Sequence, residues 1–364
     1  MRRGYSMFAV PRASNLAGRV LTNQSSNRSP QLPFLTRYIL GPEYSAVFDG
    51  RHRSTKKIGR KRNRHEMSLY IASVMSFFKP LIKYGMKETR IDGLPILLEI
   101  LERARHDRKP GLITISNHIS TLDDPMVWGI MPFSTYFDTS KVRWTLGAAD
   151  ILFTNRYIAP LFQNGQVIKT VRGDGIYQPA LDLALEKLDD SQWVHVFPEG
   201  KVNQPNVDRS VFSRELLRFK WGISRLVLES KHEPIILPIW LTGFDQVMPE
   251  GRPSPYNMIP RLNQSLSIKI SPPINDLRSS SDQNTKRHDD DDDDLQKRKN
   301  CNNHLKISEF RKRYQALQRR SQKPQDSIND HQDYSSLKDL DEAKQIRIEL
   351  ASFLHSQLLA VRPT

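Results

Sequence analysis

The chain is poor in the features that mark several large classes of protein. It has one cysteine, Cys301, among 364 residues, so it cannot form an internal disulfide, and the low-complexity stretch around Cys301 does not suit a catalytic thiol. No apolar run reaches the roughly 20 residues that span a bilayer, and the first residues lack the strong apolar block of a secretory signal. Zinc-finger, basic-zipper and aromatic ribonucleoprotein signatures are also missing.

Acidic residues are in the minority. The chain has 40 of them against 55 lysines and arginines, which gives a formal net charge of +15. Such an excess indicates an anionic partner, either nucleic acid or anionic lipid. Because no nucleic-acid signature accompanies the charge, the sequence favours a lipid surface and predicts no nucleic-acid partner.

The first 66 residues are expected to form a basic, disordered N-terminal extension. Residues 1–42 contain six arginines and no acid, a bias typical of mitochondrial presequences, although an ordinary disordered extension is the alternative. Residues 51–64 add eight basic residues without an acid. This stretch is either a solvated linker or a segment that attracts anionic headgroups.

Residues 67–84 have the spacing of an amphipathic helix. Apolar side chains recur every three or four residues, at Met67, Tyr70, Ile71, Val74, Phe77, Phe78 and Leu81. Pro80 predicts a kink or an end near Lys79. The pattern favours a membrane-binding helix that lies in the interface, with a helix of the protein core as the alternative.

A histidine and an aspartate five residues apart follow the apolar run 112–115. Residues 116–125 read Ser-Asn-His-Ile-Ser-Thr-Leu-Asp-Asp-Pro. On a regular helix, residues five apart point away from each other, so we expect a strand and then a turn that folds the Asp123 carboxylate back onto the His118 imidazole. Such a pair supplies a proton acceptor and a group to orient it, as chemistry on a hydroxyl group requires. A surface turn with a polar histidine is the alternative.

Three further runs predict strands of the same sheet, at residues 167–173, 193–202 and 234–240. The last run is apolar on both faces, which indicates a strand in the middle of the sheet. Ligands of open α/β sheets bind at the carboxyl ends of strands. The predicted ends carry His118, Arg172, Glu199 and Gly200. We expect Arg172 to hold a phosphodiester there and Lys201 to add a point charge.

Several motifs, in this order, resemble the glycerolipid acyltransferase superfamily. They are the His118 block with its aspartate five residues on, Phe197-Pro198-Glu199-Gly200, and residues 234–238. Further blocks look like the tafazzins, a family of mitochondrial phospholipid transacylases: Trp128-Gly129, Arg143-Trp144-Thr145, Ala148-Ala149-Asp150, and residues 173–178, 200–203 and 217–222. The match covers roughly residues 68–274 and a C-terminal helix, and several blocks in register rarely arise by chance.

The resemblance implies an α/β fold. We expect residues 67–278 to form a single domain like that of glycerol-3-phosphate acyltransferase, in which helices flank a mixed sheet and interfacial segments bind the membrane. By the same resemblance, residues 151–162 dip into one leaflet. Glu199 and Gly200 would shape the glycerol-phosphate pocket, with a structural turn as the alternative.

The activity implied by the resemblance is acyl transfer between phospholipids and lysophospholipids, including monolysocardiolipin, so that cardiolipin is remodelled. His118 would be the general base and Asp123 would orient it. Since the acyl donor is a phospholipid, no coenzyme A is required, and no metal or nucleotide motif appears, so we expect no cofactor. The alternatives are an acyl-CoA-dependent lysophospholipid or glycerol-phosphate acyltransferase and a non-catalytic cardiolipin-binding protein that shapes membranes.

The resemblance also implies a location and partners. The protein would be peripheral or monotopic, on the intermembrane-space face of the inner or outer mitochondrial membrane. Its partners would be phospholipids and lysophospholipids, cardiolipin and monolysocardiolipin above all. An oligomer, or an assembly with other mitochondrial membrane proteins, is left open.

The remaining segments divide into polar sequence and helices. Residues 279–335 are rich in polar residues and contain six consecutive aspartates at 289–294, so we expect a disordered insertion in which these aspartates are solvated. Residues 336–364 regain helical periodicity and are expected to pack on the domain. Residues 212–228 are either a basic, aromatic headgroup surface or an amphipathic helix.

Overall fold

The computed structural model of the chain describes residues 64–107, 110–154, 156, 159–204, 215–275, 291–321 and 332–363. The expectations for residues 1–63, which include the presequence, lie outside these ranges.

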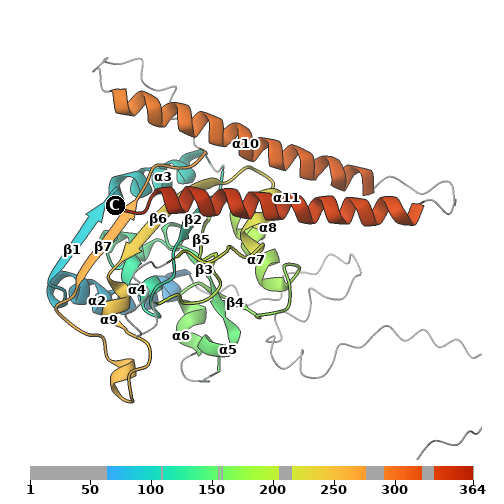
Figure 1. Cartoon of the computed structure of the whole chain (residues 1–364). Coiled ribbons are helices and arrows are strands. Elements are labelled where there is room, and N and C mark those ends of the chain that lie inside the picture. Colours follow the sequence, from blue (N-terminus) through green and yellow to red (C-terminus); the bar gives the residue numbers. More distant parts are fainter. Residues whose placement is uncertain are drawn as a thin grey trace, which may run out of the picture. The chain divides into compact units, whose positions relative to one another are not determined.

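One mixed sheet occupies the centre of the described domain (Figure 1). Its strand order is β1-β7-β6-β2-β5-β3-β4, and every neighbouring pair is parallel except β6 with β7. The strands are β1 (Glu88–Asp92), β2 (Leu112–Ser116), β3 (Trp144–Ala148), β4 (Val167–Thr170), β5 (Trp193–Val196), β6 (Ile235–Thr242) and β7 (Ser265–Ile270). The predicted mixed sheet is confirmed, and β6 has a neighbour on each side, as its apolar sequence indicates.

Helices cover both faces of the sheet because alternate strand residues point to opposite faces. Ile113 and Ile115 of β2 join one buried cluster with α7 (Pro179–Asp189), α8 (Gly222–Glu229), α10 (Asp291–Ser321) and α11 (Gln332–Ala360). Leu112 joins the other cluster with α2 (Arg64–Pro80), α3 (Leu94–Asp107), α4 (Asp123–Trp128) and α9 (Phe244–Val247). The predicted helices flanking the sheet are confirmed.

Short helices fill the remaining connections. They are the π-helical turn η2 (Leu81–Gly85), the 3-10 turns η3 (Phe133–Phe137), η4 (Thr139–Lys141) and η5 (Tyr256–Met258), and the helices α5 (Ala149–Leu152) and α6 (Ala159–Asn164). Helices α5 and α6 fall in or beside residues 151–162, the segment expected to enter a leaflet, and Ile151 in α5 is exposed.

Helix α2 presents one face to the core and another to the surface. Ile71 and Met75 are buried against the sheet layer, so the core alternative describes that face. Leu69 and Phe77 are 63% and 60% exposed. Among the described residues, no helix is long and apolar enough to cross a membrane.

The expectation of disorder for residues 279–335 is wrong for residues 291–321, which form α10. Figure 1 shows α10 lying beside α11 in the opposite direction. The average composition of α10 is polar, but four apolar side chains at helical spacing are buried on one stripe: Ile307, Phe310, Tyr314 and Leu317. Arg311, on the same face, donates hydrogen bonds to the carbonyls of Val227 and Ser230 at the end of α8. This stripe supplies the packing that composition alone does not reveal.

The segment before α8 is also different from a continuous helix over residues 212–228. Residues 215–220 are irregular and α8 begins at Gly222. The backbone N–H of Lys220 donates to the Pro198 carbonyl at 2.8 Å, so this segment is held alongside the turn after β5. Phe219 is 1% exposed and belongs to the core, which leaves its neighbours Arg218 and Lys220 at the surface.

Candidate active site

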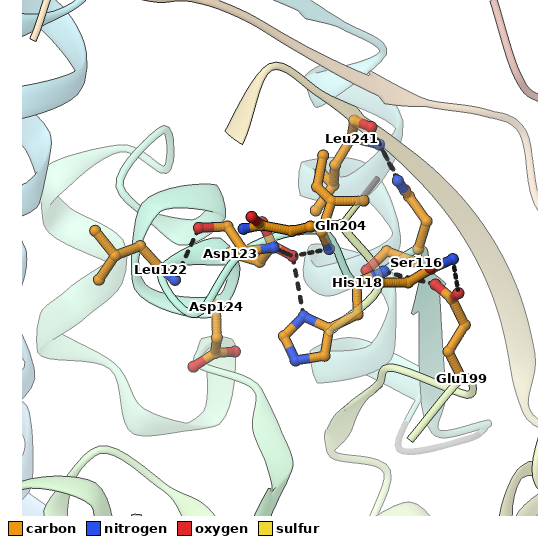
Figure 2. Close-up of polar contacts among 12 residues, drawn as sticks. Ser116, His118, Leu122, Asp123, Asp124, Glu199, Gln204 and Leu241 are labelled. Atoms are coloured by element: carbon orange, nitrogen blue, oxygen red, sulfur yellow. Dashed lines mark hydrogen bonds and ion pairs between the residues drawn. The ribbon is translucent and has the colours of Figure 1, made fainter. Parts of the chain in front are cut away.

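The His118 imidazole and the Asp123 carboxylate face each other at the carboxyl end of β2 (Figure 2). His118 Nδ1 lies 3.0 Å from Asp123 Oδ2. The same oxygen accepts hydrogen bonds from the backbone N–H groups of Ile119 at 2.6 Å and Ser120 at 2.8 Å, which wrap the turn around the carboxylate. The contact assigns the proton of a neutral imidazole to Nδ1 and leaves Nε2 as an acceptor. The structure thus brings together the pair that the spacing predicted.

Asp123 lies in a fully buried position. Burial raises the pKa of its carboxyl group above the ordinary value, while the hydrogen bond and charge of His118 and the two backbone hydrogen bonds oppose that rise. Its Oδ1 has no hydrogen-bond partner among the described residues. A buried carboxylate without a cation is costly, so its ionised form is stabilised most when the neighbouring imidazole carries a proton. Asp123 is therefore placed to orient the His118 ring and to stabilise an imidazolium that forms during a proton transfer.

Glu199 holds the backbone of His118 from the other side (Figure 2). Its Oε1 accepts from the His118 N–H at 2.9 Å, and its Oε2 accepts from the Leu217 N–H at 3.1 Å and the Asn203 side-chain amide at 2.9 Å. The backbone N–H of Asn203 donates to the His118 carbonyl at 2.7 Å. Glu199 is 1% exposed and does not line the adjacent cavity. In the structure its carboxylate lies behind the cavity and holds the His118 backbone, as a structural turn would. The resemblance implied that Glu199 shapes the glycerol-phosphate pocket.

A cavity of about 670 Å³ opens beside His118. Four of the predicted residues line it, namely His118 after β2, Arg172 after β4, and Gly200 and Lys201 after β5. Much of the rest of its wall is apolar and includes Leu146, Ile176, Leu181, Val196, Trp221 and Ile223. None of the described lining residues is acidic. The cations suit the anionic headgroup of an amphiphilic ligand, and the apolar walls suit its hydrocarbon part.

Arg172 projects from the loop 171–178, which Gln178 closes. The Gln178 side chain accepts from the Val171 N–H at 3.0 Å and donates to the Val171 carbonyl at 3.2 Å. The guanidinium of Arg172 forms an exposed ion pair with Asp150, with Nη1 3.3 Å from Oδ2. The loop and the ion pair hold Arg172 at the edge of the cavity.

Behind His118 lies a second polar cluster that is largely closed to solvent. Arg143 donates two hydrogen bonds to the Asp124 carboxylate, which also accepts from Trp128 Nε1 at 3.0 Å. Burial alone would raise the pKa of Asp124, but the charge and hydrogen bonds of Arg143 hold it below the ordinary value. His195 Nδ1 lies 2.7 Å from Thr114 Oγ1, and burial lowers the pKa of His195 to about 3. His195 is therefore neutral at physiological pH.

Phe197 separates the two histidines. Its ring stacks on His118 with centroids 4.1 Å apart and meets His195 edge-on at 4.4 Å. The sequence assigned no role to Phe197, Asn203 or Gln178. All three fall inside motif blocks, which is a positional signal, but their residue types alone do not indicate a role in fixing His118 or the Arg172 loop.

Comparison with known proteins connects this geometry to one family. A family model described as acyltransferase matches residues 96–242, which include every described residue that lines the cavity. The chain is 39% identical over 190 residues to taffazin of Dictyostelium discoideum, with 51% of this chain and 62% of that protein covered. It is 37% identical over 187 residues to tafazzin of Drosophila melanogaster, with 51% and 47% covered.

A third relative has a different name. N-acylphosphatidylethanolamine synthase of Arabidopsis thaliana is 41% identical over 211 residues, with 56% of this chain and 69% of that protein covered. The chain thus spans less than two thirds of the length of the two tafazzins and slightly more than two thirds of the Arabidopsis protein. The chain therefore belongs to the acyltransferase family, with tafazzins among its relatives.

Proposed function

We propose that this chain transfers an acyl group from a phospholipid to the hydroxyl group of a lysophospholipid, with His118 as the general base. The observation that carries the proposal is the His118 imidazole at the cavity, with Nδ1 bonded to the buried Asp123. No described residue hydrogen bonds with its Nε2. This nitrogen is the atom that accepts the proton.

The chemistry requires one proton to move twice. Nε2 of His118 takes the proton of the acceptor hydroxyl as its oxygen attacks the acyl carbonyl of the donor lipid. The imidazolium, stabilised by Asp123, then returns this proton to the departing glycerol oxygen. One ester bond forms and one breaks, so no external reagent is consumed. General-base assistance of this kind contributes a factor of about 10² to 10⁴ in rate.

The finer proposal is that the acceptor is monolysocardiolipin, that the product is remodelled cardiolipin and that coenzyme A takes no part. The motif resemblance to the tafazzins supports it, as does a cavity that joins cations to apolar walls. The Arabidopsis relative supports a second acceptor, because its name specifies acylation of the amine of phosphatidylethanolamine. The same base at His118 would serve an amine.

We also propose that the protein works on a mitochondrial membrane surface, on the intermembrane-space side. The exposed apolar residues Leu69 and Phe77 of α2 support membrane contact, together with Phe133 and Phe137 of η3, which packs against α2. Replacing Phe77 and Phe137 with serine should weaken binding to cardiolipin-containing vesicles in flotation. Tyr256→Ser, at another exposed aromatic residue, is the matched control. An equal loss of vesicle binding in this control would show that the surface formed by α2 and η3 is not the membrane contact.

The activity is tested with purified protein and a phosphatidylcholine that carries a labelled acyl chain. We expect label to reach monolysocardiolipin without added coenzyme A, and His118→Ala to reduce the rate about 10² to 10⁴-fold with an unchanged melting temperature. His232→Ala, at an exposed histidine, is the control. Strict dependence on acyl-CoA would replace the transacylase proposal with the CoA-dependent one. Preferential labelling of the phosphatidylethanolamine amine would favour the second acceptor, and full activity of His118→Ala would favour a non-catalytic membrane protein.

A further inference from the structure

The cavity beside His118 has cations on two separate sides. Arg172 follows β4, whereas Lys201 follows β5, and Arg218 and Lys220 lie in the segment held alongside the turn after β5. All four residues line the cavity and are exposed. The sequence singled out Arg172 and Lys201, but the structure adds Arg218 and Lys220 to the same wall as Lys201.

The two sides follow strands that are not neighbours in the sheet. Strand β3 lies between β4 and β5, since Ala148 pairs with Thr170 of β4 and Trp144 pairs with Val194 of β5. Two strand spacings amount to about 10 Å. Two phosphates joined by a short linker can therefore lie one beside each group of cations.

The cations after β5 have no polar partner in the described part of the chain. No described residue forms a hydrogen bond or an ion pair with the side chains of Lys201, Arg218 or Lys220. The stem of Lys220 is packed over Gly200, where a Cβ would lie 3.1 Å from Lys220 Cγ. Gly200 has a φ of 72°, so the turn both requires glycine and leaves room for this stem. The packing directs Lys220 along the cavity wall and leaves its charge unpaired.

We propose that Arg218 and Lys220, with Lys201, form a second anion subsite opposite Arg172, and that the pair of subsites selects an acceptor lipid with two phosphodiesters. This inference rests on the proposed function and names the residues that choose its substrate. An acceptor with one phosphate fills one subsite and leaves the other to solvent. Two separate lipids, one phosphate each, are the competing source of the same two anions.

Binding of headgroups without acyl chains tests the subsite independently of catalysis. The probes are the deacylated headgroup of cardiolipin, bis(glycerophospho)glycerol, and glycerophosphoglycerol, which has one phosphate. By titration calorimetry, we expect the wild-type protein to bind the two-phosphate probe about tenfold or more tightly, since one additional charge-assisted contact of this kind has roughly that effect. Arg218→Gln/Lys220→Gln should lose this preference. Equal affinities of the wild-type protein for both probes would overturn the proposal, even if acyl transfer is observed.

Kinetics distinguish one lipid with two phosphates from two lipids. With a fixed donor in micelles of constant anionic content, Arg218→Gln/Lys220→Gln should reduce kcat/KM for monolysocardiolipin about ten times more than for lysophosphatidylglycerol. Lys312→Gln, at an exposed lysine on α10, controls for the loss of surface charge. Equal reductions for both acceptors would show that the subsite holds the donor and would overturn the proposal. Absence of transfer by the wild-type protein would instead reject the proposed function, and the headgroup titration would still decide on the subsite.

Discussion

Two neighbouring aspartates serve two regions with opposite properties. Asp123 bonds to His118 at the edge of a cavity, forms no ion pair with a lysine or arginine of the described residues, and its pKa is raised chiefly by burial. Asp124 lies in the closed cluster with Arg143 and His195, where the charge of Arg143 lowers its pKa against the effect of burial. The chain therefore gives adjacent residues of one type opposite electrostatic roles.

The comparison shows what makes one histidine a base and the other a part of the scaffold. Both rings contact Phe197, but His118 lines the cavity whereas His195 is 1% exposed with its pKa lowered to about 3. A general base must change charge during each turnover. Burial penalises the charged form of His195, whereas His118 faces the cavity and is bonded to the Asp123 carboxylate. The closed cluster keeps its charges fixed and holds the open pair in place.

The largest effect on stability is expected from breaking the closed cluster. Arg143→Met leaves the Asp124 carboxylate without its cation, and removal of one partner of a buried ion pair costs about 3–5 kcal/mol. Denaturant unfolding should therefore shift to lower denaturant concentration. Adding Asp124→Asn to this variant should recover part of the loss, because no charge then remains unpaired. An unfolding curve for Arg143→Met that overlays the wild-type curve would show that the cluster is not structural.

A smaller effect, on turnover, is expected from Glu199→Gln. The Glu199 carboxylate accepts hydrogen bonds from N–H donors at both oxygens. The side-chain amide of glutamine would have to place its own NH₂ group against one of these donors. A lost buried hydrogen bond of this kind costs about 1–3 kcal/mol, and the His118 backbone moves with it. We expect kcat to fall about 10- to 100-fold with little change in KM. Glu309→Gln, at an exposed site on α10, is the control, and a rise in KM at unchanged kcat would instead place Glu199 on the substrate.

The effect that is smallest near neutral pH is a pH dependence of stability that comes from His195. The pKa of His195 is lowered in the folded protein to about 3, whereas in the unfolded chain it is near 6.5. Between about pH 3 and about pH 6.5, His195 therefore binds a proton in the unfolded chain but not in the folded protein. Stability is therefore complete above the unfolded pKa and decreases on acidification, by about 1.4 kcal/mol per pH unit. His195→Asn should remove this part of the slope when unfolding free energies are compared with the wild type over that range. Parallel slopes would contradict the assignment.

The sequence predicted the parts of the site that depend on local geometry. A spacing of five after a strand favoured the His118–Asp123 contact over a helical pair, because a helix excludes the contact and a turn permits it. A surface turn with a polar histidine was the alternative. The place of Arg172 also followed, since ligand sites collect at the carboxyl ends of parallel strands.

The remaining parts depend on contacts between distant segments. For Glu199 the sequence left two roles open, a part of the glycerol-phosphate pocket or a structural turn. The direction of its carboxylate is set by Leu217 and Asn203, which no local rule brings together. The difference between Asp123 and Asp124 comes from Arg143, which precedes β3. Helix α10 was missed because its apolar stripe is diluted by polar residues and becomes stable only against α8 and α11.

The central claim is that His118 and Asp123 act as one unit, and a double-mutant cycle on acyl transfer tests it most directly. Asp123→Asn keeps an oxygen for the backbone donors of Ile119 and Ser120 but removes the charge that stabilises the imidazolium. The account predicts that His118→Ala and Asp123→Asn each lower kcat by about 10² to 10⁴-fold, and that the double variant is no slower than His118→Ala alone. Losses that multiply in the double variant, or an Asp123→Asn protein with wild-type turnover, would contradict it.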